Sequence, residues 1–133
     1  LIATIRYKKV RIIMTQADTW CTIAVIFFIA IDYVTGVTKA IMRDNLSSRK
    51  MREGLGHKFA YLALVLVAWF IDEVNRHIDI GLPISVFVCT VGGVCLIELT
   101  SILENITEIN PELKNAPFMQ IFTQSTNGKH EKE

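Results

Sequence analysis

An aspartate at position 32 lies inside the first of three long apolar stretches of this sequence, in the run CTIAVIFFIAIDYVTGVTKA. Residues 21–31, 59–71 and 80–97 contain no charged side chain. Apolar runs of this length favour helices that cross a bilayer, where an ionisable residue marks a functional position by default. The alternative is a soluble helical core with Asp32 at the edge of a buried helix, which the length of the runs disfavours.

The charged residues are concentrated between these stretches. Residues 39–58 carry six Lys or Arg and two acids, although apolar residues make up only 51% of the chain. We therefore expect spans at about residues 19–37, 59–71 and 80–103, joined by solvated connections. One Lys or Arg lies in the second connection, four precede the first span and three follow the third. This count predicts an external N-terminus and a cytoplasmic first connection and C-terminus, with the inverse orientation as the alternative.

The sequence divides into three segments: a basic interfacial segment at residues 1–18, a three-helix transmembrane domain at 19–104, and a polar C-terminal segment with a charged tail at 105–133. Asn110 followed by Pro111 predicts an N-cap and a short helix that leads to Pro117. Residues 123–133 are polar and charged, which predicts a disordered tail. No cleavage-site pattern follows the first span, so we expect the mature protein to retain it. The predicted class is an all-α membrane protein with three transmembrane helices.

Several function classes are disfavoured. The net charge of +1 gives no electrostatic reason for nucleic-acid binding. The sequence has no G-x-S-x-G elbow, H-E-x-x-H motif or phosphate-binding glycine loop. The three cysteines lie in apolar runs without C-x-x-C spacing, so neither a disulfide framework nor a zinc site is indicated. We expect no enzymatic activity, no metal and no cofactor, with membrane lipid as the surrounding partner.

A polar stripe runs along the first span, because helical spacing places Asp32, Gly36 and Lys39 on one face. A charge near the bilayer centre costs about 3 kcal/mol, so Asp32 needs a partner, a water-filled lumen or a proton. One hypothesis is that helix contacts hide the stripe before activation and that it lines a pore afterwards. The alternative is a static pair of Asp32 with Lys39 or with a basic residue of the first connection. Glu98 in the third span has the same two interpretations.

A face of small residues lies on the third span, where Ser85, Cys89 and Gly93 recur every four residues with Gly92 beside them. Small residues let helix backbones approach closely in lipid. The face either joins copies of the chain or packs the third span within one chain.

The first connection is expected to be a basic loop on the cytoplasmic surface. Anionic lipid attracts each such residue by about 1 kcal/mol. Ordinary anchoring of a cytoplasmic loop is the favoured explanation of this charge, and specific lipid recognition is the alternative. The residues of this loop are Arg43, Arg49, Lys50, Arg52 and Lys58.

The stretches DYVTGVTKA at 32–40 and LSSRKMREGLGHK at 46–58, followed by an apolar helix that ends in Asp72, resemble the phage-lysis and toxin-secretion holin family of Gram-positive bacteria and their phages. The resemblance covers roughly residues 20–120. Its most specific part is the Asp-Tyr-x-Thr-Gly motif, followed by Ser-Ser and a basic, glycine-containing segment. The positions of the family type are Asp32, Thr35, Gly36, Ser47, Ser48, Arg52, Gly54 and Lys58.

The resemblance implies a holin that homo-oligomerises in the bacterial cytoplasmic membrane and forms lesions there. Such lesions dissipate the proton-motive force and release a murein hydrolase (endolysin) or, in relatives, a large toxin. The alternative is a non-lytic membrane scaffold or an accessory subunit of a secretion complex, because a three-span pattern permits both.

Overall fold

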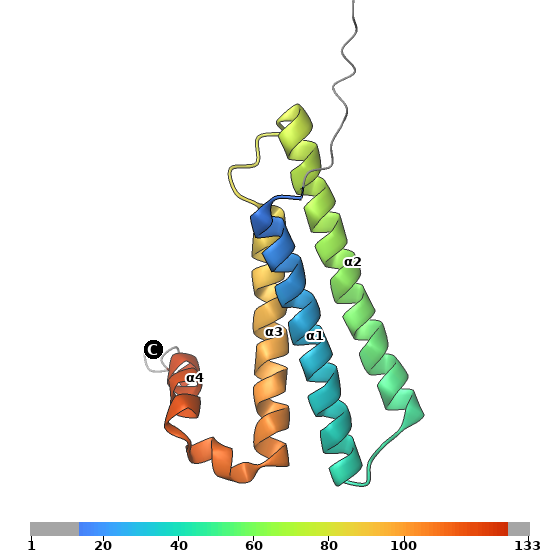
Figure 1. The fold of residues 1–133 in the computed structure, drawn as a ribbon, viewed down its shortest axis with the longest axis vertical. Helices are drawn as coiled ribbons and strands as arrows, with labels where there is room; N and C mark the ends of the chain where they lie inside the picture. The colour runs from blue at the N-terminus through green and yellow to red at the C-terminus, as the bar shows by residue number, and fades with distance from the viewer. Residues whose placement is uncertain (1–13, 128–133) are drawn as a thin grey trace, which may run out of the picture.

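The computed structural model describes residues 14–127 and consists of three long helices followed by two short ones (Figure 1). Helix α1 spans Gln16–Met42, α2 spans Ser48–Ile78 and α3 spans Val86–Ile109. A 3-10 helix, η1 (Pro111–Asn115), and helix α4 (Pro117–Asn127) complete the described chain. All three long helices are long and apolar enough to cross a membrane. The predicted all-α class with three transmembrane helices and a short C-terminal helix is confirmed.

Helix α1 is longer than the predicted span of residues 19–37. A capping box begins it: the Thr15 hydroxyl accepts from the Asp18 backbone N–H at 3.1 Å, and the Asp18 carboxylate accepts from the Thr15 N–H at 3.2 Å. The helix therefore includes the end of the predicted interfacial segment, while residues 1–13 lie outside the described residues. Helix α1 ends before Asp44, which has a positive φ of 51°.

Helix α2 corrects the prediction of a basic loop. Its first three turns carry Arg49, Lys50, Arg52 and Lys58, and only Arg43 lies in the short connection at residues 43–47. Lys, Arg, Glu and Met are good helix formers, so the helix extends well before the apolar run at 59–71. The charged residues are thus side chains of a helix that continues beyond the apolar run.

Helix α3 begins six residues later than predicted, because α2 supplies its cap. The Asp72 carboxylate of α2 accepts from the backbone N–H groups of Val86 at 2.8 Å and Phe87 at 3.1 Å, and also from the Ser85 hydroxyl. Ser85 itself accepts from the Val88 N–H at 3.0 Å. These bonds satisfy N–H groups that every helix start leaves free. Residues 80–85, including Pro83, form the connection rather than the first turn of the helix.

The C-terminal part agrees with the sequence at its start and differs at its end. Asn110 caps η1 by accepting from the Glu112 N–H at 3.2 Å, as predicted. Helix α4 then covers residues 123–127, which were predicted to belong to a disordered tail. The rings of Phe118 and Phe122, one turn apart, meet edge to face with centroids 5.9 Å apart. Residues 128–133 lie outside the described residues.

Helix α3 is the central element of the bundle. It packs along α1 and also against α2, whereas α1 and α2 touch each other at few positions. Of the most apolar stretch of each helix, 28% is buried in α3 but only 11% in α1 and in α2. The small core between the three helices consists of Val25, Val65, Ala68, Phe87, Val91 and Val94.

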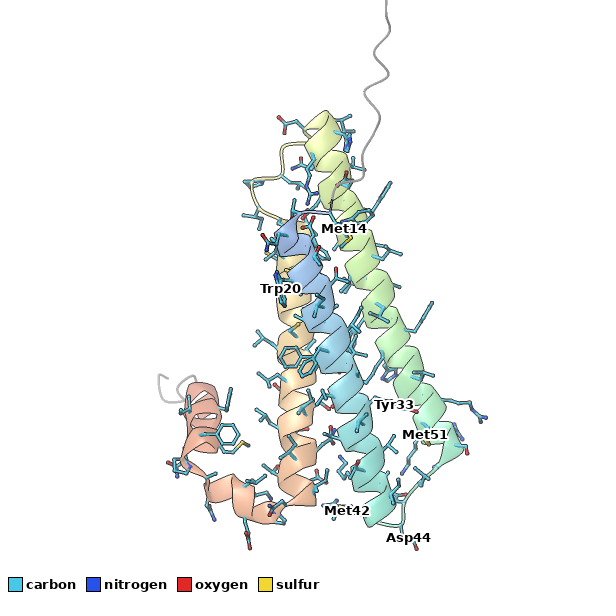
Figure 2. All side chains as sticks on the ribbon, in the orientation of Figure 1. Met14, Trp20, Tyr33, Met42, Asp44 and Met51 are labelled. Carbon is cyan, nitrogen blue, oxygen red and sulfur yellow. The ribbon has the colours of Figure 1, made fainter. Side chains whose placement is uncertain are left out.

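The outer surface of the bundle is strongly apolar. Large side chains such as Phe59 (72% exposed), Leu96 (67%) and Leu66 (63%) point away from the other helices, and Figure 2 shows side chains projecting outward along all three long helices. Contiguous apolar surface of this extent is rare on soluble proteins and typical of lipid-facing helices. The hydrocarbon of a bilayer is therefore the solvent that this surface fits.

Replacing Asp72 by alanine should destabilise the first turn of α3. The loss of three accepted hydrogen bonds is expected to cost about 1–2 kcal/mol and to leave the first N–H groups of the helix without an acceptor. Hydrogen exchange should show faster exchange of the Val86 and Phe87 amides. Glu53→Ala, which removes an exposed acid near the other end of α2, should leave these amides unchanged. Equal exchange in both variants would show that Asp72 does not cap α3.

Candidate functional site

The three long helices meet at a buried ionic layer, which consists of Asp32 on α1, Lys58 on α2 and Glu98 on α3. The Lys58 ammonium lies 2.6 Å from the Asp32 carboxylate and 2.5 Å from the Glu98 carboxylate. All three side chains are nearly inaccessible, at 11%, 11% and 2% exposure for Asp32, Lys58 and Glu98. One cation therefore holds two acids from two different helices.

A second set of polar groups supports Asp32. The Asn105 amide on α3 donates to the free oxygen of the Asp32 carboxylate at 3.1 Å and to the Thr35 hydroxyl at 3.3 Å. Thr35 in turn donates to the backbone carbonyl of Ile31 at 2.9 Å. Gly36 lies beside this network, since a Cβ there would stand in ordinary van der Waals contact, 3.6 Å from the Asn105 amide nitrogen. The carboxylate thus has partners on both oxygens, as a charge in a low-dielectric interior requires.

The ionic layer arises from a seven-residue spacing in each helix. Buried positions recur at 18, 25 and 32 in α1, at 58, 65 and 72 in α2, and at 91, 98 and 105 in α3. A seven-residue repeat keeps one seam of a helix facing its neighbours. In α1 and α2 a valine separates two polar residues along this seam, whereas in α3 Val91 is followed by Glu98 and Asn105. The polar groups of α1 and α2 therefore form two layers with apolar packing between them.

The second polar layer lies at the opposite end of the bundle. Arg76 on α2 binds Asp18 of α1 at 2.9 Å and Glu73 of its own helix at 2.9 Å. Asp72, one turn before Arg76, caps α3 as described above. This layer joins the start of α1, the end of α2 and the start of α3, so both ends of the apolar core are closed by charged or hydrogen-bonded contacts.

The structure places the predicted polar stripe inside the bundle. Asp32 and Glu98 are brought together by Lys58, while Lys39 lies further along α1, 3.8 Å from Glu108 of α3. Arg43 pairs with the same carboxylate at 2.9 Å. In this state Asp32 forms a static pair with a basic residue, which was one of the two alternatives at the sequence level.

The small residues of α3 lie elsewhere. Ser85 is the N-cap of α3, Cys89 is exposed, and an added Cβ at Gly92 or Gly93 would meet no atom within 4 Å. Among the described helices, none therefore approaches these two glycines closely. The face remains open toward the surroundings of the bundle.

Sequence reasoning did not anticipate the role of Lys58 as the common partner of two acids, nor the parts played by Asn105, Asp72 and Arg76. The signal that would have found most of them is the seven-residue spacing. Lys58, Val65 and Asp72 share one seam of α2, as Val91, Glu98 and Asn105 do on α3. Arg76 lies off this seam, so only its contact with Asp18 identifies it.

A bundle with an apolar exterior and internally paired charges defines a multi-pass membrane protein. The model of the bacteriophage holin family matches residues 10–120, so the chain belongs to this family. No match was found among curated proteins or among solved structures. Members of the family are non-enzymatic, pore-forming proteins of the cytoplasmic membrane, and the resemblance drawn from the sequence is confirmed.

Replacing Lys58 by leucine should destabilise the bundle strongly. It leaves two buried carboxylates facing each other without a cation, which is expected to lower the free energy of unfolding by about 3–5 kcal/mol. Replacing Asp32, Lys58 and Glu98 together by leucine should regain most of this loss, because a buried ion network is often no more stabilising than apolar packing. Unfolding in mixed detergent, followed by circular dichroism, measures both effects.

Arg49→Leu is the matched control, since the Arg49 side chain is 84% exposed and pairs only with Glu53 on the surface. If Lys58→Leu unfolds at the same point as Arg49→Leu, the ionic layer does not hold the three helices together.

Proposed function

We propose that this chain acts as a holin: copies accumulate in the cytoplasmic membrane, assemble, and open a lesion that dissipates the proton-motive force. The lesion then releases a murein hydrolase or a toxin. The observation that supports this proposal is the burial of Asp32, Lys58 and Glu98 inside a bundle with an apolar exterior. Such a chain inserts without exposing its charges, and it carries a polar seam that an assembled lesion needs.

The proposed opening separates α2 from α1 and exposes this seam to water. Few contacts join α1 to α2, so the free energy that resists this separation comes mainly from the ion pair of Lys58 with Asp32. With all three groups ionised, the ionic layer carries one excess negative charge. A lumen filled with water solvates that charge, whereas the closed bundle must hold it at low dielectric. Solvation of this charge by water in the lumen therefore stabilises the open arrangement relative to the closed bundle.

Assembly between copies is proposed to use the open face of α3. Gly92 and Gly93 present bare backbone to the surroundings, where another helix can approach closely. When two such faces meet, the second helix takes the place of lipid tails on the first. Close van der Waals packing between the two helices supplies the attraction.

Expression of the parent chain in bacteria should collapse the membrane potential and kill the cells, because a lesion short-circuits the ion gradients. Gly92→Leu and Gly93→Leu are expected to insert normally but to remain small on crosslinking and to lose lethality, since a leucine side chain keeps the opposing helix at a distance. A potential-sensitive dye and chemical crosslinking of the same cultures measure both effects.

Gly56→Leu is the control for replacing a helical glycine by leucine. Gly56 lies on α2, and a Cβ there also meets no atom within 4 Å, so this variant should kill like the parent. A parent chain that leaves the potential intact over many generations contradicts the holin proposal. Lethal, fully assembled Gly92→Leu and Gly93→Leu variants place the assembly face elsewhere. Co-purification of a stoichiometric second protein without dye leakage from liposomes favours a scaffold.

The proposed orientation puts the connection between α1 and α2 in the cytoplasm. In a variant whose three native cysteines are replaced by alanine, a cysteine at Ser47 should react with an impermeant maleimide in inside-out vesicles but not in intact cells. A cysteine at Ile80, in the connection at the other end of the bundle, should show the opposite pattern. Labelling of the Ser47 position in intact cells would show that the chain is inserted the other way round.

A further inference from the structure

A cavity of about 430 Å³ lies between the lower halves of α1 and α2, as Figure 1 is oriented. Its walls come from the last turns of α1, the connection at residues 43–47 and the first turns of α2. Glu108 is the one lining residue from α3. The cavity therefore borders the ionic layer, because Asp32 and Lys58 belong to both, and it extends from there to the connection between α1 and α2.

The charge of this cavity is positive. Its lining includes the cations Lys39, Arg43, Lys50 and Lys58 and the acids Asp32 and Glu108. Lys58 is held between Asp32 and Glu98. Lys39 and Arg43 both pair with Glu108. Among the described residues Lys50 forms no ion pair, and its ammonium donates only to the Asn45 side chain at 3.4 Å. Lys50 is thus available to a ligand at the wall of the cavity. Arg43 contacts Glu108 through Nη1, and its side chain is 58% exposed, so its guanidinium can also reach a ligand there.

The start of α2 adds to this positive field. Ser47, the N-cap residue, makes no side-chain capping bond, and the first turn of α2 contains no acid. Ser47 and Lys50 both line the cavity. The positive end of a long helix therefore reinforces the ammonium of Lys50 toward an anion.

The apolar surroundings distinguish the type of anion. A second hollow of about 240 Å³ shares Tyr33 and Met51 with the first. Tyr33, Met51 and Leu55 give it an aromatic and aliphatic wall, and Ser48 and Arg52 complete its lining. Figure 2 labels Tyr33 and Met51 beside the lower halves of α1 and α2. Leu46 and Leu55 are 54% and 58% exposed. A ligand that fits both hollows has a phosphate at one end and acyl chains at the other. The α2 residues of the cavity lie directly before the apolar run at 59–71 begins.

We propose that this cavity binds the phosphate of an anionic phospholipid, with Lys50 and Arg43 as its cationic contacts and the hollow at Tyr33, Met51 and Leu55 against the acyl chains. Basic pockets between transmembrane helices are suited to such headgroups. The site does not depend on lesion formation, because it is present in the single closed chain. It is also distinct from general attraction of basic residues to a charged surface, since it assigns different roles to Lys50 and its neighbour Arg49.

The test uses the full chain in a neutral detergent with equal amounts of phosphatidylglycerol and phosphatidylcholine, and counts retained lipids by native mass spectrometry. Phosphatidylglycerol should be retained preferentially, with one molecule bound per chain. Lys50→Gln should lower its retention about tenfold, as expected for the loss of one charge-assisted contact. Arg49→Gln, which removes the same charge one residue away but outside the cavity, should stay within about twofold of the parent.

Arg43→Gln provides a second, independent variant and should also lower retention, while circular dichroism checks that each variant remains helical. Glycerol 3-phosphate is the water-soluble competitor. If it binds in a Lys50-dependent way and displaces the lipid at equal concentration, the site takes free phosphates and the lipid assignment is wrong. Equal retention by Lys50→Gln and Arg49→Gln, or equal retention of the two lipids, also overturns the proposal.

Discussion

The ammonium of Lys58 is the contact on which the arrangement of the three helices depends. Within residues 14–127 it is the one group that pairs with acids of both α1 and α3, within 2.6 Å of each. Apolar contacts alone gain little in a bilayer, because lipid tails are as apolar as the side chains that would replace them. Helix association there needs close packing or polar contacts, and the core of this bundle is small. A cation shared by two helices supplies what the apolar core does not.

The distribution of polar groups explains how one sequence satisfies two environments. Many of the residues that face lipid are large and apolar, and those that face the seam include both apolar side chains, several of them valines, and charged or amide side chains. A charge placed on the outer face would cost several kcal/mol in hydrocarbon, whereas the same charge on the seam finds a partner. The separation of the two faces follows from the helical period, and it lets a single chain pair these charges internally while its outer surface stays apolar.

The sequence alone predicted the class of fold. Three uncharged runs separated by basic residues are the direct signature of helices that cross a bilayer. It misplaced the ends of the helices. Hydropathy detects where apolar residues stop, but α2 continues through Arg49 and Lys50 because these residues form helix readily. The start of α3 depends on Asp72, a residue thirteen positions away from Ser85 in the sequence. A cap of this kind is a tertiary contact, and no local pattern encodes it.

The candidate site was predicted in part for the same reason. Asp32 and Glu98 stood out as acids in apolar surroundings, whereas Lys58 looked like one more basic residue at the membrane surface. What distinguishes Lys58 is its register with Val65 and Asp72, and this becomes visible only when the seams of three helices are compared. The seven-residue spacing also carries a consequence for how the helices find each other. Sliding α2 by one heptad, about 10 Å, would set a charge against a valine. A mispaired register is therefore penalised at both ends of the core at once, and a newly inserted chain has one alignment in which every charge is met.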